Sequence, residues 1–113
     1  MTDLNLTKLA AKLPANTFTQ TADDVTVSLK TLTGEAAVQL DDEVVAETFT
    51  KLLTGASEAQ VDHNAANPED TIASYPAPNF GNPVASDGGG FTARRNHTVS
   101  VAIPLNVDEA TAV

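Results

Sequence analysis

The pattern that most constrains this chain is a strict alternation of apolar and polar residues near its end. In the segment FTARRNHTVSVAIPLNV, residues 91–107, every odd position from Val99 to Val107 is apolar, and the even positions between them are polar, small or proline. A period of two is typical of a β-strand with one buried face. Pro104 cannot donate a hydrogen bond to a sheet, so we expect this strand to lie at a sheet edge or to be bulged there.

The length of this segment raises a packing problem. One straight strand of 17 residues would span about 55 Å at about 3.3 Å per residue. A compact chain of 113 residues has a radius of gyration of about 13 Å and a diameter of about 35 Å. The segment must therefore bend or project beyond the domain, and a projecting strand with an open edge invites pairing with a neighbouring chain.

Weaker patterns predict the remaining elements. Residues 24–33 alternate in β-branched residues and predict a strand, and 17–21 and 36–40 are candidates for two further strands. The apolar residues of 4–13 recur at the spacing of a short helix, which Pro14 would end.

The clearest helix is predicted over residues 41–61. Asp41 is a suitable N-cap, and Leu40 and Val45 occupy the two positions of a hydrophobic staple. Gly55 either ends this helix or lies within it, and we favour continuation because the apolar stripe persists beyond it. The stripe is formed by Val45, Phe49, Leu52, Ala56 and Ala59.

These elements predict a single α+β domain spanning 1–113. Its small, mainly antiparallel sheet would come from 24–33 and 96–107, widened by 17–21 and 36–40, with the long amphipathic helix packed on one face. Residues 64–90 contain four prolines and a glycine triplet, and we expect a long irregular loop or arm there. Tyr75, Phe80 and Val84 are the side chains we expect to anchor this loop to the body.

Composition excludes several classes of function. Fifteen acidic residues against six basic ones give a net charge of −9, which disfavours binding to nucleic acid or to an anionic membrane. The absence of cysteine excludes disulfides, thiolate metal sites and cysteine nucleophiles. Neither a signal peptide nor a transmembrane run is recognisable, so we predict a cytoplasmic protein.

No catalytic, cofactor or metal site is predicted. The triplet Gly88–Gly90 lacks the Lys-Ser/Thr of a phosphate loop and is interpreted as a turn. A calcium loop beginning at Asp62 would lack its glycine and its bidentate glutamate. His63 and His97 lie far apart in the sequence, and we expect each to be a surface or hydrogen-bonded histidine.

A set of candidate interface residues follows from the arm hypothesis. Arg94 and Arg95 form the only basic doublet of the chain, and strand alternation would place them on opposite faces. One of them is a candidate for an ion pair with a carboxylate of a neighbouring subunit. Tyr75 and Phe80 are the aromatic candidates for the same interface.

Three functional hypotheses remain open. The first is a non-enzymatic structural or assembly protein that forms homo-oligomers, such as a virus- or prophage-type particle component. The second is a module that binds a protein or peptide through the 64–90 loop. The third is a small-ligand binder or enzyme, which would need a closed pocket between helix and sheet that holds Tyr75, His97 or Arg95.

Overall fold

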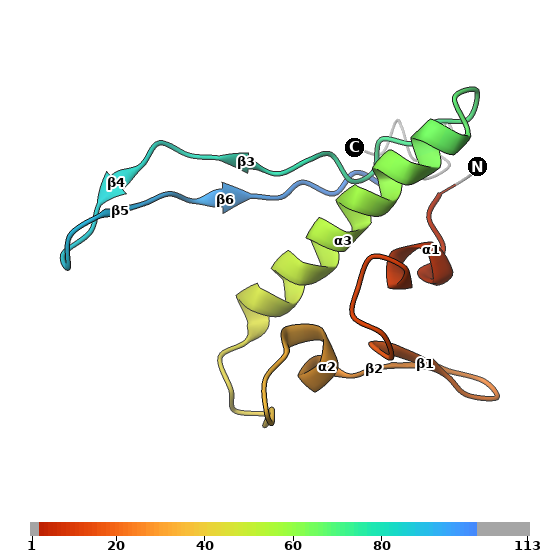
Figure 1. Cartoon of the computed structure of the whole chain (residues 1–113), viewed down its shortest axis with the longest axis horizontal. Helices are drawn as coiled ribbons and strands as arrows, with labels where there is room; N and C mark the ends of the chain where they lie inside the picture. Colours follow the sequence, from red (N-terminus) through yellow and green to blue (C-terminus); the bar gives the residue numbers. More distant parts are fainter. Residues whose placement is uncertain (1–2, 102–113) are drawn as a thin grey trace, which may run out of the picture.

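A computed structural model describes residues 3–101 of the chain. Figure 1 shows a body built around one long helix and an arm that projects from it. The body contains helix α1 (Leu6–Ala10), strands β1 (Phe18–Gln20) and β2 (Val25–Val27), helix α2 (Leu29–Thr33) and helix α3 (Val45–Ala66). The arm contains strands β3 (Asn79–Phe80), β4 (Val84–Ala85), β5 (Phe91–Thr92) and β6 (Arg95–Asn96).

The strands form three antiparallel ladders of two strands each. β1 pairs with β2, β3 with β6, and β4 with β5. The α+β class predicted from the sequence is confirmed, with one long helix accompanied by small antiparallel sheets. The predicted pairing of 24–33 with 96–107 is not present among the described residues, because β2 pairs with β1 and β6 pairs with β3.

The core lies where α1 and α2 pack against α3, with α2 beside the first half of the long helix and α1 farther along it. Leu32 of α2 is 1% exposed, and Ala56 and Ala59 of α3 are also buried. Gly55 lets α1 and the segment after it approach closely, because a Cβ at this position would lie 3.3 Å from a methyl carbon of Leu9 in α1 and 2.8 Å from one of Leu13. The helix continues through Gly55, as predicted, and ends at Ala66 rather than near 61.

The second half of the predicted strand 24–33 is a helix instead. The Ser28 side chain accepts a hydrogen bond from the Thr31 amide and caps α2, and Gly34 ends it in the left-handed conformation with φ of 77°. Matching caps at both ends outweigh the alternation of apolar residues over so short a segment.

The start of the long helix also differs from the prediction. The Asp42 carboxylate accepts a hydrogen bond from the Gln39 amide, and the Asp42 amide returns one to the Gln39 carbonyl, so a turn occupies 39–42. The helix therefore begins at Val45, without the Asp41 cap, and 36–40 contains no strand. The predicted staple is absent, since Leu40 and Val45 are both exposed.

The predicted C-terminal strand is much shorter in the described residues. Strand β6 covers Arg95–Asn96, and 97–101 has no strand, although the Ser100 amide donates to the Ser74 carbonyl. Positions 102–107 lie outside the described residues. The radius of gyration is 17.8 Å, against about 13 Å for a compact chain of this length, because the arm projects from the body.

Candidate protein interface

The base of the arm is held by polar side chains on the last turns of α3. The Asn64 side chain exchanges two hydrogen bonds with the backbone of Ile72, at 2.8 and 3.0 Å. The Gln60 side chain accepts a hydrogen bond of 2.7 Å from the Tyr75 amide. Residues 70–75 are therefore fixed along the end of the helix, and they set the point from which the arm departs.

The next part of the arm is fixed to α3 by Arg95. Phe80 and Arg95 are cross-strand neighbours in the β3–β6 ladder, and the guanidinium carbon lies 5.9 Å from the centre of the Phe80 ring. The same guanidinium donates a 2.9 Å hydrogen bond to the Thr54 hydroxyl. Arg95 thus combines a cation–π contact with a hydrogen bond across to the helix, which defines the direction of the arm.

A bulge separates the two ladders of the arm. Four residue steps lead from Phe80 to Val84, whereas three lead from Thr92 to Arg95, although the two pairs face each other. The strand that contains Pro83 therefore carries one extra residue, as in a β-bulge, which bends and twists a ribbon. A hollow of about 440 Å³ lies at the bulge, with Val84 and Arg94 among its lining residues.

The outer end of the arm is a glycine-rich hairpin turn. The Gly89 amide donates to the Ser86 carbonyl, and the Ser86 amide donates to the Gly90 carbonyl. Gly89 and Gly90 have φ values of 88° and 76°, a region that other residues adopt at a cost. The interpretation of this triplet as a turn is confirmed.

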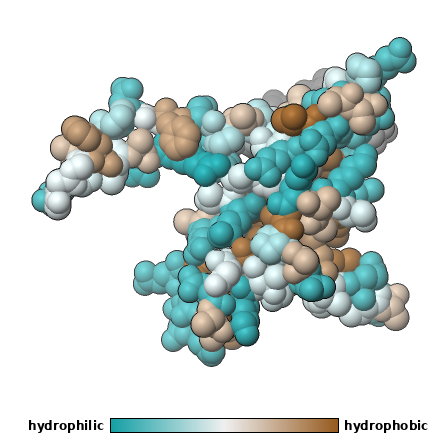
Figure 2. All heavy atoms as spheres, in the orientation of Figure 1, coloured by the Kyte–Doolittle hydropathy of each residue, from teal (hydrophilic) through white to brown (hydrophobic). Residues whose placement is uncertain are grey.

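The apolar side chains of the arm are exposed. Phe80, Val84 and Phe91 are 66%, 64% and 76% exposed, so the prediction that Phe80 and Val84 anchor the segment to the body is wrong. Figure 2 shows patches of apolar colour recurring along the projecting arm. Alternation from the paired positions places Phe80, Phe91 and Arg95 on one face and Val84 and Arg94 on the other.

The four candidate interface residues occupy different places. Phe80 and Arg95 are in contact, and Arg94 lies on the opposite face, as predicted from strand alternation. Tyr75 is half-buried at the base of the arm. Sequence reasoning missed Phe91, although its position after a glycine turn, facing Ala85, is a signal for the second strand of a hairpin.

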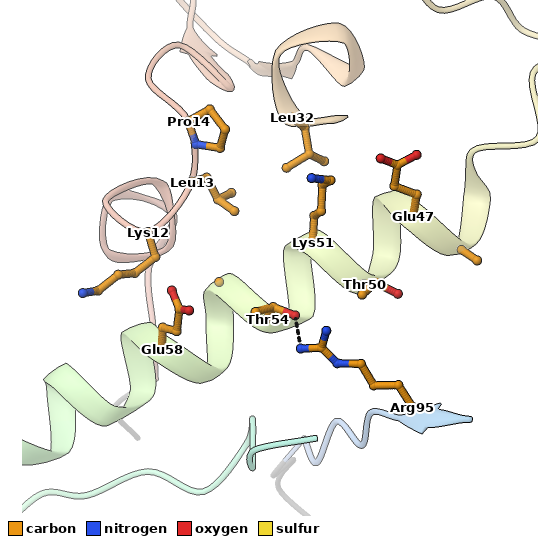
Figure 3. Close-up of a pocket in the computed structure, with 12 residues that line it drawn as sticks. Lys12, Leu13, Pro14, Leu32, Glu47, Thr50, Lys51, Thr54, Glu58 and Arg95 are labelled. Carbon is orange, nitrogen blue, oxygen red and sulfur yellow. Dashed lines mark hydrogen bonds between the residues drawn. The ribbon is translucent and has the colours of Figure 1, made fainter. Parts of the chain in front are cut away.

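A cleft of about 530 Å³ lies between the segment that follows α1, helix α2 and helix α3. Figure 3 shows Leu13 and Leu32 pointing toward α3, with Lys51 between the helices and Arg95 reaching Thr54 from the other side. Of the three residues proposed for an enzyme pocket, Arg95 lines this cleft, and Tyr75 and His97 do not. No nucleophile is paired with a base among the lining residues that the structure describes.

Near the cleft, one ion pair perturbs a titratable group. Lys12 lies 2.5 Å from Asp62, and the hydrogen bond and charge of that carboxylate raise the pKa of Lys12 above its ordinary value. Both side chains are substantially exposed, so the pair contributes little to stability.

The two histidines differ. His63 is buried, with Nδ1 3.1 Å from the Lys8 ammonium and Nε2 3.0 Å from the Asp70 carbonyl, so the expectation of a hydrogen-bonded histidine is confirmed for it. The Nε2 atom of His97 is buried and has no hydrogen-bond partner among the described residues. The two are not gathered with carboxylates, and residues 3–101 contain no cluster of three or more His, Asp or Glu residues suited to a metal ion.

Within the part of the chain that the structure describes, no helix combines the length and apolar character needed to cross a bilayer. Comparison with known proteins finds no family model, no curated protein and no solved structure that matches this chain.

Proposed function

We propose that this protein is a non-enzymatic structural subunit that self-associates through its arm. The observation that carries the proposal is the projecting two-stranded ribbon, whose strands are exposed throughout. An isolated pair of strands is marginally stable in water, and further strands or a packed face are usually required. This ribbon contacts the body only near its base in the described residues, and its outer part is exposed. A partner would supply the packing that this outer part lacks.

The exposed apolar surface of the arm is large enough to contribute measurably to the free energy of association. Phe80, Val84 and Phe91 together leave the equivalent of about two whole side chains in water, and burying them would contribute about 3–6 kcal/mol. Association costs about 4–15 kcal/mol in lost freedom of motion. The free energy gained from one arm contact is therefore comparable to the lower end of the cost of association. A stable assembly needs two reciprocal arms or additional contacts.

The two edges of the ribbon differ in their ability to pair. The segment from 76 to 85, which contains β3 and β4, carries Pro76, Pro78 and Pro83 close to these strands, and prolines cannot donate hydrogen bonds and so protect that edge. The returning strand has no proline from Phe91 to Val101. The edge of this returning strand is the one on which a neighbouring chain would add.

An arm that reaches a neighbour suits a subunit of a larger particle. A contact between different surfaces of identical subunits propagates into rings, shells or filaments, whereas a reciprocal contact closes as a dimer. A particle component of virus or prophage type is the specific form of this proposal, and it rests on the small, cysteine-free composition together with the arm. The cytoplasmic location stays a prediction from the sequence.

Sedimentation equilibrium of the full chain tests the proposal from about 1 µM to about 1 mM, a range that covers association free energies of about −8 to −4 kcal/mol. The expected result is a mass that rises above 11.7 kDa toward a multiple of it. The variant Phe80→Ser/Val84→Ser/Phe91→Ser should stay monomeric. Val61→Ser removes a similarly exposed side chain from α3 and should behave like the wild type.

A monomer at every concentration would overturn self-association. It would favour the alternative of an interaction module that uses the same exposed arm for a different protein.

A further inference from the structure

The apolar stripe of α3 is covered along half of its length. Ala56, Ala59 and His63 are buried on this face, whereas Val45 and Phe49, on the same face two to three turns earlier, are 65% and 60% exposed. Helix α1 and the segment after α3 cover the second half of the helix. Helix α2 lies beside the first half of α3, yet Val45 and Phe49 remain exposed with α2 in this position. Val45 and Phe49 are called the open stripe below.

Carboxylates flank the open stripe. Asp41, Asp42 and Glu43 immediately precede α3 and its first exposed apolar residue, Val45. The single ion pair within residues 3–101 is formed by Lys12 and Asp62, so none of these three carboxylates has a cationic partner in the described part of the chain.

The charges of the body and the arm are opposite. Residues 3–75 contain four lysines and twelve carboxylates, a net charge of −8 with neutral histidines. Residues 76–101 contain both arginines of the protein and one carboxylate, Asp87, a net charge of +1. The face of the arm that carries Val84 and Arg94 therefore complements an acidic apolar stripe in both hydrophobicity and charge.

The arm of the same chain does not cover the open stripe. It leaves from the far end of α3, and its outer half points away from the first turns of the helix. Arg95 is also held at Thr54, and the open stripe keeps its exposure with the arm in this position. The complementary surface must then come from another molecule.

We propose that the open stripe is the docking surface for the arm of a second copy of this chain. Val84 of one copy, which lies on the same face of the arm as Arg94, contacts Val45 and Phe49 of the other. Arg94, which has no ion-pair partner in residues 3–101, faces the carboxylates that precede α3. This inference rests on the proposed self-association and assigns the surface that receives the arm.

Mixing two full-length variants tests the pairing. Val45→Ser/Phe49→Ser disables the open stripe and leaves the arm intact, and Phe80→Ser/Val84→Ser/Phe91→Ser does the reverse. Each should be monomeric alone by light scattering, and the equimolar mixture should form a complex of the two. All five positions are at least 60% exposed, and far-UV circular dichroism checks that each variant is folded. Val61→Ser, on another face of α3, is the matched control and should assemble like the wild type.

Each other outcome has a definite meaning. If the wild type and the stripe variant each self-associate, this inference is overturned and the proposed function stays intact. Two monomeric variants that do not associate when mixed would overturn the pairing of arm with stripe. A monomeric wild type would overturn both proposals.

Charge reversal provides a second test. Arg94→Glu should weaken self-association by about tenfold or more, because it places like charges together. Lys30→Glu changes the net charge of the protein equally at an exposed site on α2 and should weaken association less. Equal effects of the two changes would indicate a dependence on net charge alone and would contradict a contact at Arg94.

Discussion

Replacing His63 should destabilise the body by an amount that the structure allows us to bound. The ring is 5% exposed and joins two segments to α3, with Lys8 on one side and Asp70 on the other. Loss of two hydrogen bonds, at about 0.5–1.5 kcal/mol each, together with the cavity left by the ring, predicts a loss of about 2–4 kcal/mol for His63→Ala. Small domains unfold with about 5–15 kcal/mol in total, so the effect should be large.

Urea denaturation followed by circular dichroism measures this loss, since the chain has no tryptophan. The protein concentration should be fixed, because self-association would add to the apparent stability. Lys8→Met removes one of the two hydrogen bonds from an exposed side chain and should cost about 1 kcal/mol. Val61→Ala, at an exposed site, should change stability by less than about 0.5 kcal/mol.

The same geometry defines the tautomer of His63. A lysine ammonium can only donate and a backbone carbonyl can only accept, so Nδ1 accepts from Lys8 and Nε2 carries the proton donated to Asp70. Nitrogen chemical shifts from long-range proton–nitrogen spectra distinguish the two neutral tautomers. A proton on Nδ1 of the neutral ring, or a His63→Ala variant as stable as the wild type, would refute this reasoning.

Three further predictions concern single sites. Gly55→Leu should separate α1 from α3 and cost about 1–3 kcal/mol in urea denaturation, since even a Cβ lies 2.8 Å from Leu13; unchanged stability would contradict the close packing. Gly90→Val should open the hairpin turn, because a β-branched residue is strained at φ of 76°, and faster amide exchange in β4 and β5 with unchanged exchange in α3 would report it. Asp62→Asn should lower the pKa of Lys12 toward its ordinary value of 10.5, measured by NMR titration. Because the folded pKa is raised, the contribution of this pair is fully present below pH 10.5 and is lost as the pH rises through the folded value.

The sequence predicted the elements with long or repeated patterns. The stripe through Phe49 and Ala56 predicts α3 across Gly55, and the short helix α1 follows from the same apolar spacing. The main error in the prediction for the body was the strand expected where α2 forms, and local helix caps explain it. Ser28 and Gly34 define α2 within a segment whose alternation indicates a strand, and single-residue caps are hard to weigh against periodicity before the tertiary contacts are known.

The prediction of which strands pair was further from the structure, because pairing depends on contacts between residues that are distant in the sequence. The turn at Gly88–Gly90 was recognised, yet its flanking segments have too few alternating residues to predict the β4–β5 ladder. The bulge after Phe80 shifts the register by one residue, and nothing in the local sequence besides Pro83 indicates it. The contact between Phe80 and Arg95 therefore became visible in the structure, although both residues were candidates beforehand.

Hydrogen exchange of the arm amides as a function of protein concentration tests most directly whether the arm binds another copy. If the arm binds another copy, amides of β4 and β5 should exchange rapidly at about 1 µM and slowly at about 1 mM, while α3 amides near Ala59 change much less. Rapid exchange in the arm at both concentrations, with α3 protected throughout, would contradict the claim that the arm is an assembly element.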